Sequence, residues 1–490
     1  MTDSAADLPN PATTLRAQVR SAVLWRSGTQ ILGQMIAWGS TFAVIRILSP
    51  ADYGLFAMTQ VILVLLNMLN GYGLASALIQ RADADERAVR QLFGMLILLN
   101  FGLGAAQYAA APLAAAYFRH DEVIALLRVQ SLLYVTTPFI ALPYALLARA
   151  MDFRRQAAVN LLSATAGAIA ALAGALAGLG VWTLVLAPLV LFTTRAIGMM
   201  SAARAWMWPS FDFRGAGSMA RYGGLMASAQ LFWFLQSQAD VFIAGRSFDA
   251  HTLGIYTTSL FLAQIFVSKF VPALNDVAFS AYARLQDTPE AVARAFLTSV
   301  QLILLVAMPL YLGLAVTARP LVAVVLGEQW LATGPVVALL ALAMPFMTVQ
   351  QLFAPACDAR GRPGISARNA ATGAVVLGAG FLAGAQGGLT GLALAWVIAY
   401  PLFLLICAHR TLPAIGVSAR ELLAAAVVPA GAASAMAAVV LAVSALLPEL
   451  PALPTLAVLI AVGAATYAAI LFGFARETTA RAIALVRHRG

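Results

Sequence analysis

The sequence predicts an all-α integral membrane protein, and three observations support this fold class. Hydrophobic residues make up 62% of the 490-residue chain, charged residues only 10%, and the mean hydropathy is +0.86. A soluble domain carries roughly 25% charged residues, so this chain cannot cover its surface with charge. The apolar runs are continuous over about 20 residues, which is the length of a spanning helix and not the weak alternation of a barrel strand.

Fourteen apolar runs are long enough to be transmembrane spans. Only Gly178-Leu179-Gly180 separates the fifth span from the sixth, and only the segment AQGGLTG separates the eleventh from the twelfth. Because each of these pairs can be read as one long segment, we expect 12–14 transmembrane helices. The spans begin near Ser21, Leu55, Gln91, Val123, Ala157, Val181, Tyr222, Leu253, Ala293, Gly334, Arg368, Thr390, Glu421 and Ala452.

The distribution of basic residues predicts the orientation. If the N-terminus is cytoplasmic, twenty-three of the thirty basic residues fall at cytoplasmic ends of spans and only five fall at outer ends. This bias places both termini in the cytoplasm. It also accounts for the net charge of +10, and because the basic residues are spread over eight cytoplasmic segments we expect no nucleic-acid partner.

The two halves of the chain repeat each other. Two interrupting segments, VIRILSPADYGLFAMTQ (44–60) and IAGRSFDAHTLGIYTTS (243–259), break apolar runs in the same way. Arg46 and Gly54 of the first match Arg246 and Gly254 of the second at an offset of 200. Each repeat holds six spans, so the two repeats are parallel and we expect a pseudo-twofold axis along the membrane normal. The predicted domains are a cytoplasmic N-terminal tail (1–20), an N-terminal six-helix lobe (21–203), a cytoplasmic inter-lobe linker (204–221), a C-terminal six-helix lobe (222–410), two additional transmembrane helices (411–475) and a basic cytoplasmic tail (476–490).

The segment RILSPADYGLFAM resembles bacterial oligosaccharide flippases of the polysaccharide transport (Wzx-like) family, within the multidrug/oligosaccharidyl-lipid/polysaccharide exporter superfamily. LLARAMDFRRQ, QADVFIAGRSFDAHTLGIY, NDVAFSAYARLQDTPEAVARAF and VVLGEQWLATG resemble the family too, so the resemblance extends from about Ser21 to Arg410. The second interrupting segment lacks the Pro-Asp of the first. The resemblance implies two six-helix lobes around a central cavity.

The function that the resemblance implies is transport of lipid-linked (undecaprenyl-diphosphate-type) oligosaccharide repeat units. They would move from the cytoplasmic to the periplasmic leaflet of the bacterial inner membrane by alternating access, for exopolysaccharide, capsule or O-antigen synthesis. The expected partners are this lipid-linked oligosaccharide and membrane lipids. A polysaccharide polymerase, chain-length proteins and a coupling proton or sodium ion are further candidates.

Ionisable residues inside spans are candidate site residues, since each is costly unless it meets a partner or a wet cavity. Asp240 lies toward the periplasmic end of the seventh span, at a position where the resembled family also has an acid. It could bind a proton, a cation or sugar hydroxyls, or it could pair with Arg246. Arg246 itself is a cavity candidate, with an anchor at the outer interface as the alternative.

Three further basic residues are cavity candidates. Lys269, the single lysine of the chain, lies about 16 residues into the eighth span, where an ammonium would attract a diphosphate. The alternative is a buried ion pair with an acid such as Asp276. Arg26 and Arg195 lie near cytoplasmic span ends, where a guanidinium could hold the pyrophosphate or reach the lipid headgroups.

Other classes of protein fit the sequence less well. An enzyme would need a nucleotide-binding loop, a metal-ligand spacing or a nucleophile constellation, and none of these is present, so we expect no enzyme, cofactor or metal. The alternatives that stay open are a cation-coupled multidrug exporter of the same superfamily and a flippase of another isoprenoid-linked glycan, such as the peptidoglycan precursor. The sequence does not indicate which sugar is carried.

Overall fold

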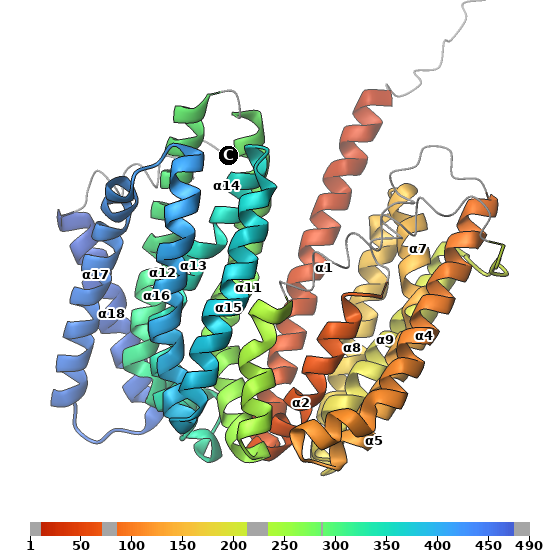
Figure 1. Cartoon of the computed structure of the whole chain (residues 1–490), viewed down its shortest axis with the longest axis horizontal. Helices are drawn as coiled ribbons and strands as arrows, with labels where there is room; N and C mark the ends of the chain where they lie inside the picture. The colour runs from red at the N-terminus through yellow and green to blue at the C-terminus, as the bar shows by residue number, and fades with distance from the viewer. Residues whose placement is uncertain (1–10, 71–85, 213–233, 286–287, 475–490) are drawn as a thin grey trace, which may run out of the picture. The chain divides into compact units, whose positions relative to one another are not determined.

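The computed structural model describes residues 11–70, 86–212, 234–285 and 288–474, with side chains from residue 28 onward. Within these ranges the regular secondary structure is helical and there is no β-strand (Figure 1). The helices group into two compact units, which are described separately here. Unit 1 comprises Met1–Leu48 and Ile62–Gln230, and unit 2 comprises Ser49–Val61 and Leu231–Gly490.

Twelve helices within the described ranges are long and apolar enough to cross a membrane, and they match twelve of the fourteen predicted spans. The remaining two spans begin near Ser21 and Tyr222, where side chains lie outside the described residues. Two of the twelve are broken helices. The fourth span has two breaks, at Ser131 and at Thr137. The second precedes Pro138, which has no N–H to continue the hydrogen-bond ladder.

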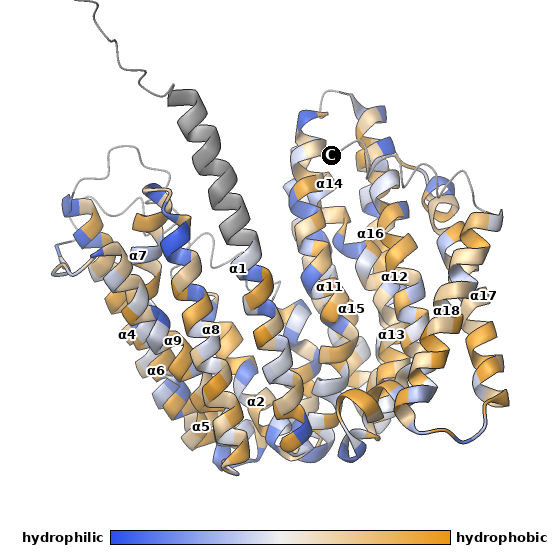
Figure 2. Cartoon of the chain, turned by 180° about the vertical axis from the view of Figure 1, so that it is seen from behind, coloured by the Kyte–Doolittle hydropathy of each residue, from blue (hydrophilic) through white to orange (hydrophobic). Residues whose placement is uncertain are grey.

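The helix surfaces show that the solvent of this protein is lipid. Large apolar side chains are exposed along the helices, with Leu113 75% exposed, Leu176 77% and Leu446 85%. Figure 2 shows hydrophobic residues along the length of most helices and polar residues concentrated at helix ends. Because every backbone group is hydrogen-bonded inside a helix, this arrangement is stable in hydrocarbon. The chain is therefore a multi-span membrane protein, as its composition predicts.

Unit 1 is built around α8, which packs against both α1 and α9, while α7 packs on α9 and α4. The core between α4 and α7 contains Leu92, Phe93, Leu96, Leu142 and Ala145. The helices of this unit are α1 (Pro11–Ile47), α4 (Glu86–Phe118), α5 (Glu122–Gln130), α6 (Leu132–Thr136), α7 (Pro138–Arg149), α8 (Phe153–Leu176) and α9 (Val181–Ala203), together with the end of α2 (Pro50–Asn67).

Unit 2 is built around α13, which packs on α11, α12 and α16, while α15 packs on α16. Its elements follow the same order along the chain as those of unit 1, as the repeat predicts. They are a helix over 234–247, α11 (Ala250–Arg284), α12 (Pro289–Val325), η1 (Glu328–Trp330), α13 (Thr333–Gln351), α14 (Phe353–Ala359), α15 (Pro363–Ala385), α16 (Gly388–Ile415), α17 (Ala419–Leu446) and α18 (Ala452–Phe474).

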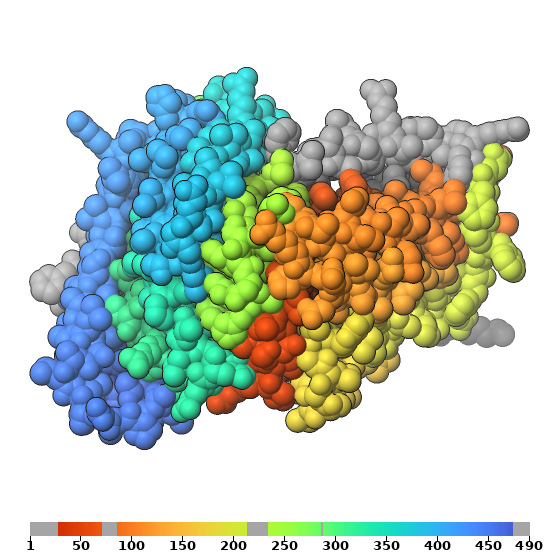
Figure 3. Space-filling model, turned by 60° about the horizontal axis from the view of Figure 1, so that its bottom comes forward, coloured from red at the N-terminus to blue at the C-terminus, as the bar shows by residue number. Residues whose placement is uncertain are grey.

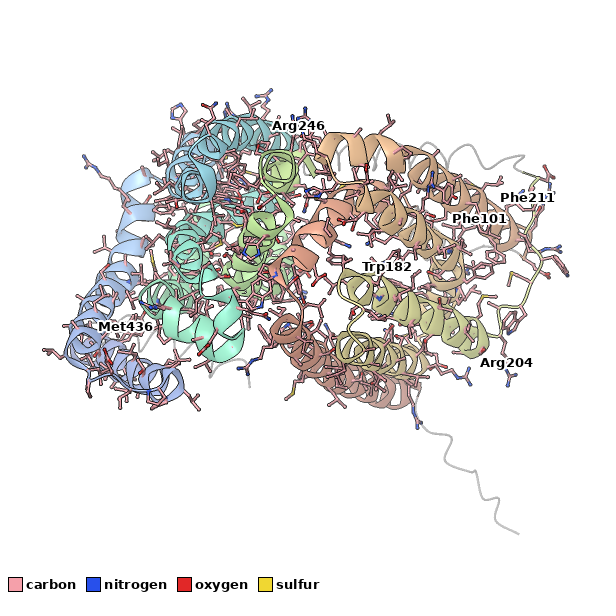
Figure 4. All side chains as sticks on the ribbon, turned by 90° about the horizontal axis from the view of Figure 1, so that it is seen from below. Phe101, Trp182, Arg204, Phe211, Arg246 and Met436 are labelled. Atoms are coloured by element: carbon pink, nitrogen blue, oxygen red, sulfur yellow. The ribbon has the colours of Figure 1, made fainter. Side chains whose placement is uncertain are left out.

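The last two helices, which lie outside the repeat, pack on the outer side of α12. Met436 and Val440 of α17 form a small core with Leu459 of α18, and Leu312 and Val316 of α12 cover this core. Figure 3 shows α17 and α18 at one edge of unit 2, and Figure 4 marks Met436 among these helices. They extend unit 2 without entering the centre of its helix packing.

The two interrupting segments of the repeat lie in direct contact. A Cβ on Gly54 would overlap the carbonyl oxygen of Ala250, and a Cβ on Gly254 would overlap the carbonyl oxygen of Pro50. In the repeat, Gly54 matches Gly254 and Pro50 matches Ala250. The contact of Gly54 with Ala250 is therefore the same as the contact of Gly254 with Pro50, with the two halves of the chain exchanged. Such a reciprocal pattern is the mark of a local twofold, and it requires small residues so that the two backbones can meet.

The contact between the two interrupting segments lies within unit 2. The first turns of α2 belong to that unit, whereas Ile62–Asn67 belong to unit 1. The single helix α2 therefore runs through both units. The predicted lobe boundaries place all of α2 in the N-terminal lobe, and those boundaries stay a prediction.

Candidate functional site

The first candidate site is a buried carboxylate in unit 2. Asp240 lies on the helix over 234–247 and is only 2% exposed. Its Oδ2 accepts a hydrogen bond of 2.7 Å from the Tyr256 hydroxyl of α11. An ionised carboxylate in such a position is costly without a compensating charge or hydrogen bond, so the tyrosine contact stabilises it.

A third residue completes a chain of hydrogen bonds. The Trp396 indole N–H of α16 donates to the Tyr256 hydroxyl over 2.7 Å, and the Trp396 ring stacks on Tyr400 with centroids 5.0 Å apart. An indole nitrogen only donates, so the direction runs from Trp396 to Tyr256 to Asp240. One chain of hydrogen bonds thus links side chains of three helices and ends at the Asp240 carboxylate, which can hold a proton or a small cation.

The sequence analysis found Asp240 but missed Tyr256 and Trp396. Trp396 lies 140 positions from the tyrosine that it contacts, and no local pattern joins them. One signal was present in the repeat. At the offset of 200, Asp240 and Tyr256 match Ser40 and Phe56, so the polar pair exists in the second half alone.

The second candidate site is an open cavity of about 350 Å³ in unit 1, lined by α1, α7, α8 and α9. Arg195 of α9 lines it, as do the side chains of Gln34 and Asn160. The Arg195 Nε donates to the Ser163 hydroxyl over 3.2 Å, and its guanidinium carbon lies 5.5 Å from the Phe192 ring centroid. Among the described residues that line the cavity, Arg195 carries the only charge.

Lys269 is an exposed residue of α11. Asp276 and Ser280 are also exposed and lie on the same helix face, at spacings of seven and four residues. Because the side chains of Lys269 and Asp276 are both exposed, they do not form the buried ion pair considered as an alternative. An exposed ammonium within a span must meet water, a lipid headgroup or an anionic ligand.

The other predicted residues lie elsewhere. Arg246 is exposed near the end of the helix over 234–247 and is marked in Figure 4. It does not share the burial of Asp240. Arg26 belongs to α1, but its side chain lies outside the described residues. Among the described residues, no group of three His, Cys, Asp or Glu side chains could hold a metal ion.

Two cysteines complete the inventory of reactive groups. Cys357 of α14 and Cys407 of α16 are both buried and both free.

The fold defines a polytopic helical membrane protein. Two solved structures show this fold. The lipid II flippase MurJ, in its inward closed conformation, matches with a TM-score of 0.76 and 12% identity over 93% of this chain and 99% of that one. The inward-facing conformation of a multidrug resistance MATE family transporter of the MOP superfamily matches with a TM-score of 0.60 and 16% identity, over 78% and 96%.

The chain belongs to the polysaccharide biosynthesis protein family, whose model matches residues 43–335. It is 28% identical to the succinoglycan biosynthesis transport protein ExoT of Rhizobium meliloti over 70% of this chain and 69% of that protein. It is 27% identical to the teichuronic acid biosynthesis protein TuaB of Bacillus subtilis (55% and 56%) and 23% identical to the lipopolysaccharide biosynthesis protein WzxC of Escherichia coli (67% of each). The family resemblance of the segment at Arg46 is therefore confirmed.

Proposed function

We propose that this protein is a flippase that moves lipid-linked oligosaccharide repeat units from the cytoplasmic to the periplasmic leaflet of the inner membrane. The observation that carries the proposal is membership of the polysaccharide biosynthesis family together with the twelve-span fold over the described residues. The relatives act in the biosynthesis of succinoglycan, teichuronic acid and lipopolysaccharide, according to their names. A drug exporter and a peptidoglycan-precursor flippase have support from the fold alone.

The mechanism that fits is alternating access, in which the two halves of a transporter rock about a substrate site. The lipid diphosphate requires positive charge, which Lys269 supplies on an exposed face of α11. Asp240, as a buried carboxylate at the end of a chain of hydrogen bonds, suits the binding of a coupling proton or sodium ion.

We place both termini in the cytoplasm because the basic residues concentrate on that side.

The function is tested by measuring export of surface polysaccharide in a strain from which the gene for this protein has been deleted. The wild-type chain is expected to restore export, and Lys269→Ala to reduce it below about a tenth, because one charge-assisted contact to phosphate is lost. Lys269→Arg should retain part of the activity, since the charge stays while its geometry changes. Export is measured as cell-surface polysaccharide per cell, normalised to the amount of protein in the inner membrane.

Arg284→Ala is the matched control, because Arg284 is exposed at the end of the same helix. It should export at the wild-type level. Normal export by Lys269→Ala would reject the role of this lysine, and unchanged polysaccharide in the deletion strain would reject the proposed function itself.

Orientation has an independent test. Reporter fusions placed after Arg90, Arg155, Arg214 and Arg362 are expected to give cytoplasmic signals at all four positions, because each follows an even number of spans. The paired readout is alkaline phosphatase, which is active only outside the cytoplasm, and green fluorescent protein, which is fluorescent inside. One periplasmic position among the four would contradict the predicted topology.

A further inference from the structure

The cavity in unit 1 has a lining that differs from that of a phosphate site. Four carboxamide residues line it, Gln30, Gln34, Gln156 and Asn160, and an amide can both donate and accept hydrogen bonds. The Gln156 amide nitrogen already donates to the Tyr144 carbonyl oxygen over 2.9 Å, which leaves its oxygen as an acceptor. An ionised diphosphate only accepts, so it would leave the amide oxygens without a donor. A sugar hydroxyl donates and accepts, so it fits such a lining. Tyr144 also lines the cavity and offers an aromatic surface to a sugar ring.

The single charge in this lining is held in place from two sides. The Ser163 hydroxyl accepts from Arg195 and itself donates to the Asn160 carbonyl oxygen over 3.0 Å, while Phe192 flanks the guanidinium. Arg195 lies eight residues before the end of α9, which is about 12 Å from that end. A fixed guanidinium at this depth matches one planar carboxylate, which it can bind through two parallel hydrogen bonds.

The equivalent helices of unit 2 carry a related contact. There Arg410 donates to the Thr372 hydroxyl over 2.6 Å, which joins α15 to α16 as the contact between Arg195 and Ser163 joins α8 to α9. Asn369 and Thr372 match Asn160 and Ser163 at one offset of 209. One difference is that the Asn369 amide donates to the Thr411 hydroxyl over 3.1 Å, so in unit 2 this amide is bonded to the neighbouring helix.

From this geometry we infer that the cavity is a sugar subsite that selects an acidic sugar, a hexuronic acid or another carboxylate-bearing residue of the repeat unit. The inference rests on the proposed function and narrows its substrate class. The volume lies within the range of about 300–1,000 Å³ typical of small-molecule sites. Arg195 binds the sugar carboxylate, and the amides bind the ring hydroxyls.

The experiment uses full-length protein in lipid nanodiscs and three probes: methyl glucuronoside, methyl glucoside and inorganic pyrophosphate. Binding is measured by ligand-observed NMR and by competition between the probes. The glucuronoside is expected to bind about tenfold more tightly than the glucoside, since one charge-assisted contact distinguishes them. Arg195→Gln should remove this preference by weakening glucuronoside binding about tenfold.

Asn160→Asp provides a second variant that does not depend on the Arg195 contact. It has nearly the same shape and adds a negative charge to the lining, so it should weaken the glucuronoside selectively. Arg204→Gln is the control, because Arg204 is exposed at the C-terminal cap of α9, at the edge of unit 1 in Figure 4. It should bind all three probes as the wild type does.

Equal binding of the glucuronoside and the glucoside by the wild-type protein would overturn the inference. Displacement of the glucuronoside by pyrophosphate at lower concentration would also overturn it, because the cavity would then be a diphosphate site. The proposed flippase function is tested separately, by polysaccharide export in the deletion strain. A negative binding result would therefore reject the acidic-sugar subsite without rejecting the flippase function.

Discussion

Gly54→Leu and Gly254→Leu are each expected to prevent the accumulation of folded protein in the membrane. Both glycines lie where the backbones of α2 and α11 meet, and a Cβ on either would overlap a carbonyl oxygen of the opposite helix. A backbone atom cannot move aside as a flexible side chain can, so the helices must separate. Overpacking typically costs about 1–3 kcal/mol or more, and a leucine at a backbone contact belongs at the upper end.

Alanine at the same two positions gives a graded test. Gly54→Ala and Gly254→Ala are each expected to lower the free energy of unfolding by about 1–3 kcal/mol. Because both act on one contact, the double variant should cost less than the sum of the two single variants. The measurement is unfolding of detergent-solubilised protein, followed by fluorescence or by retention of the native elution volume.

Gly378→Ala is the matched control, since Gly378 lies within α15 and a Cβ there would meet no atom within 4 Å. This change should be neutral or stabilise by up to about 1 kcal/mol, because alanine is the better helix former. If Gly254→Ala were as stable as Gly378→Ala, the close contact at the two interrupting segments would not exist.

Asp240→Asn is expected to leave the protein folded and abundant while reducing polysaccharide export below about a tenth of the wild-type level, as loss of an intramembrane functional charge does. The asparagine oxygen can still accept the hydrogen bond from Tyr256, so the chain that ends at Asp240 stays intact. What is lost is the negative charge, and with it the capacity to hold a proton or cation. The measurements are surface polysaccharide and protein abundance in the same cells.

Asp240→Ala separates the structural contribution of this residue from its charge. It removes the acceptor from the buried Tyr256 hydroxyl, which costs about 1–3 kcal/mol of stability in addition to the loss of export. Tyr256→Phe is the companion variant, since it removes the hydroxyl that bonds Asp240 and keeps the ring. Wild-type export by Asp240→Asn would show that the charge has no part in transport and that the residue serves packing alone.

Several properties of this protein could be read along the chain. Twelve predicted spans coincide with helices because a span depends on the hydropathy of about 20 consecutive residues. The repeat was visible through Gly54 and Gly254, which keep their spacing from Arg46 and Arg246. Asp240 and Lys269 were singled out because an ionisable residue within an apolar run is conspicuous in any sequence.

The partners of these residues could not be read in this way. Tyr256 contacts Asp240, and Trp396 contacts Tyr256, because their three helices are turned toward one another. The rotation of a helix is set by its packing against segments far away in the sequence. The same holds for the open cavity around Arg195, which four helices of unit 1 line. Hydropathy and charge bias act on each segment separately and therefore predict spans and orientation. Contacts between segments depend on crossing angles and side-chain fit, which exist only once the helices have packed.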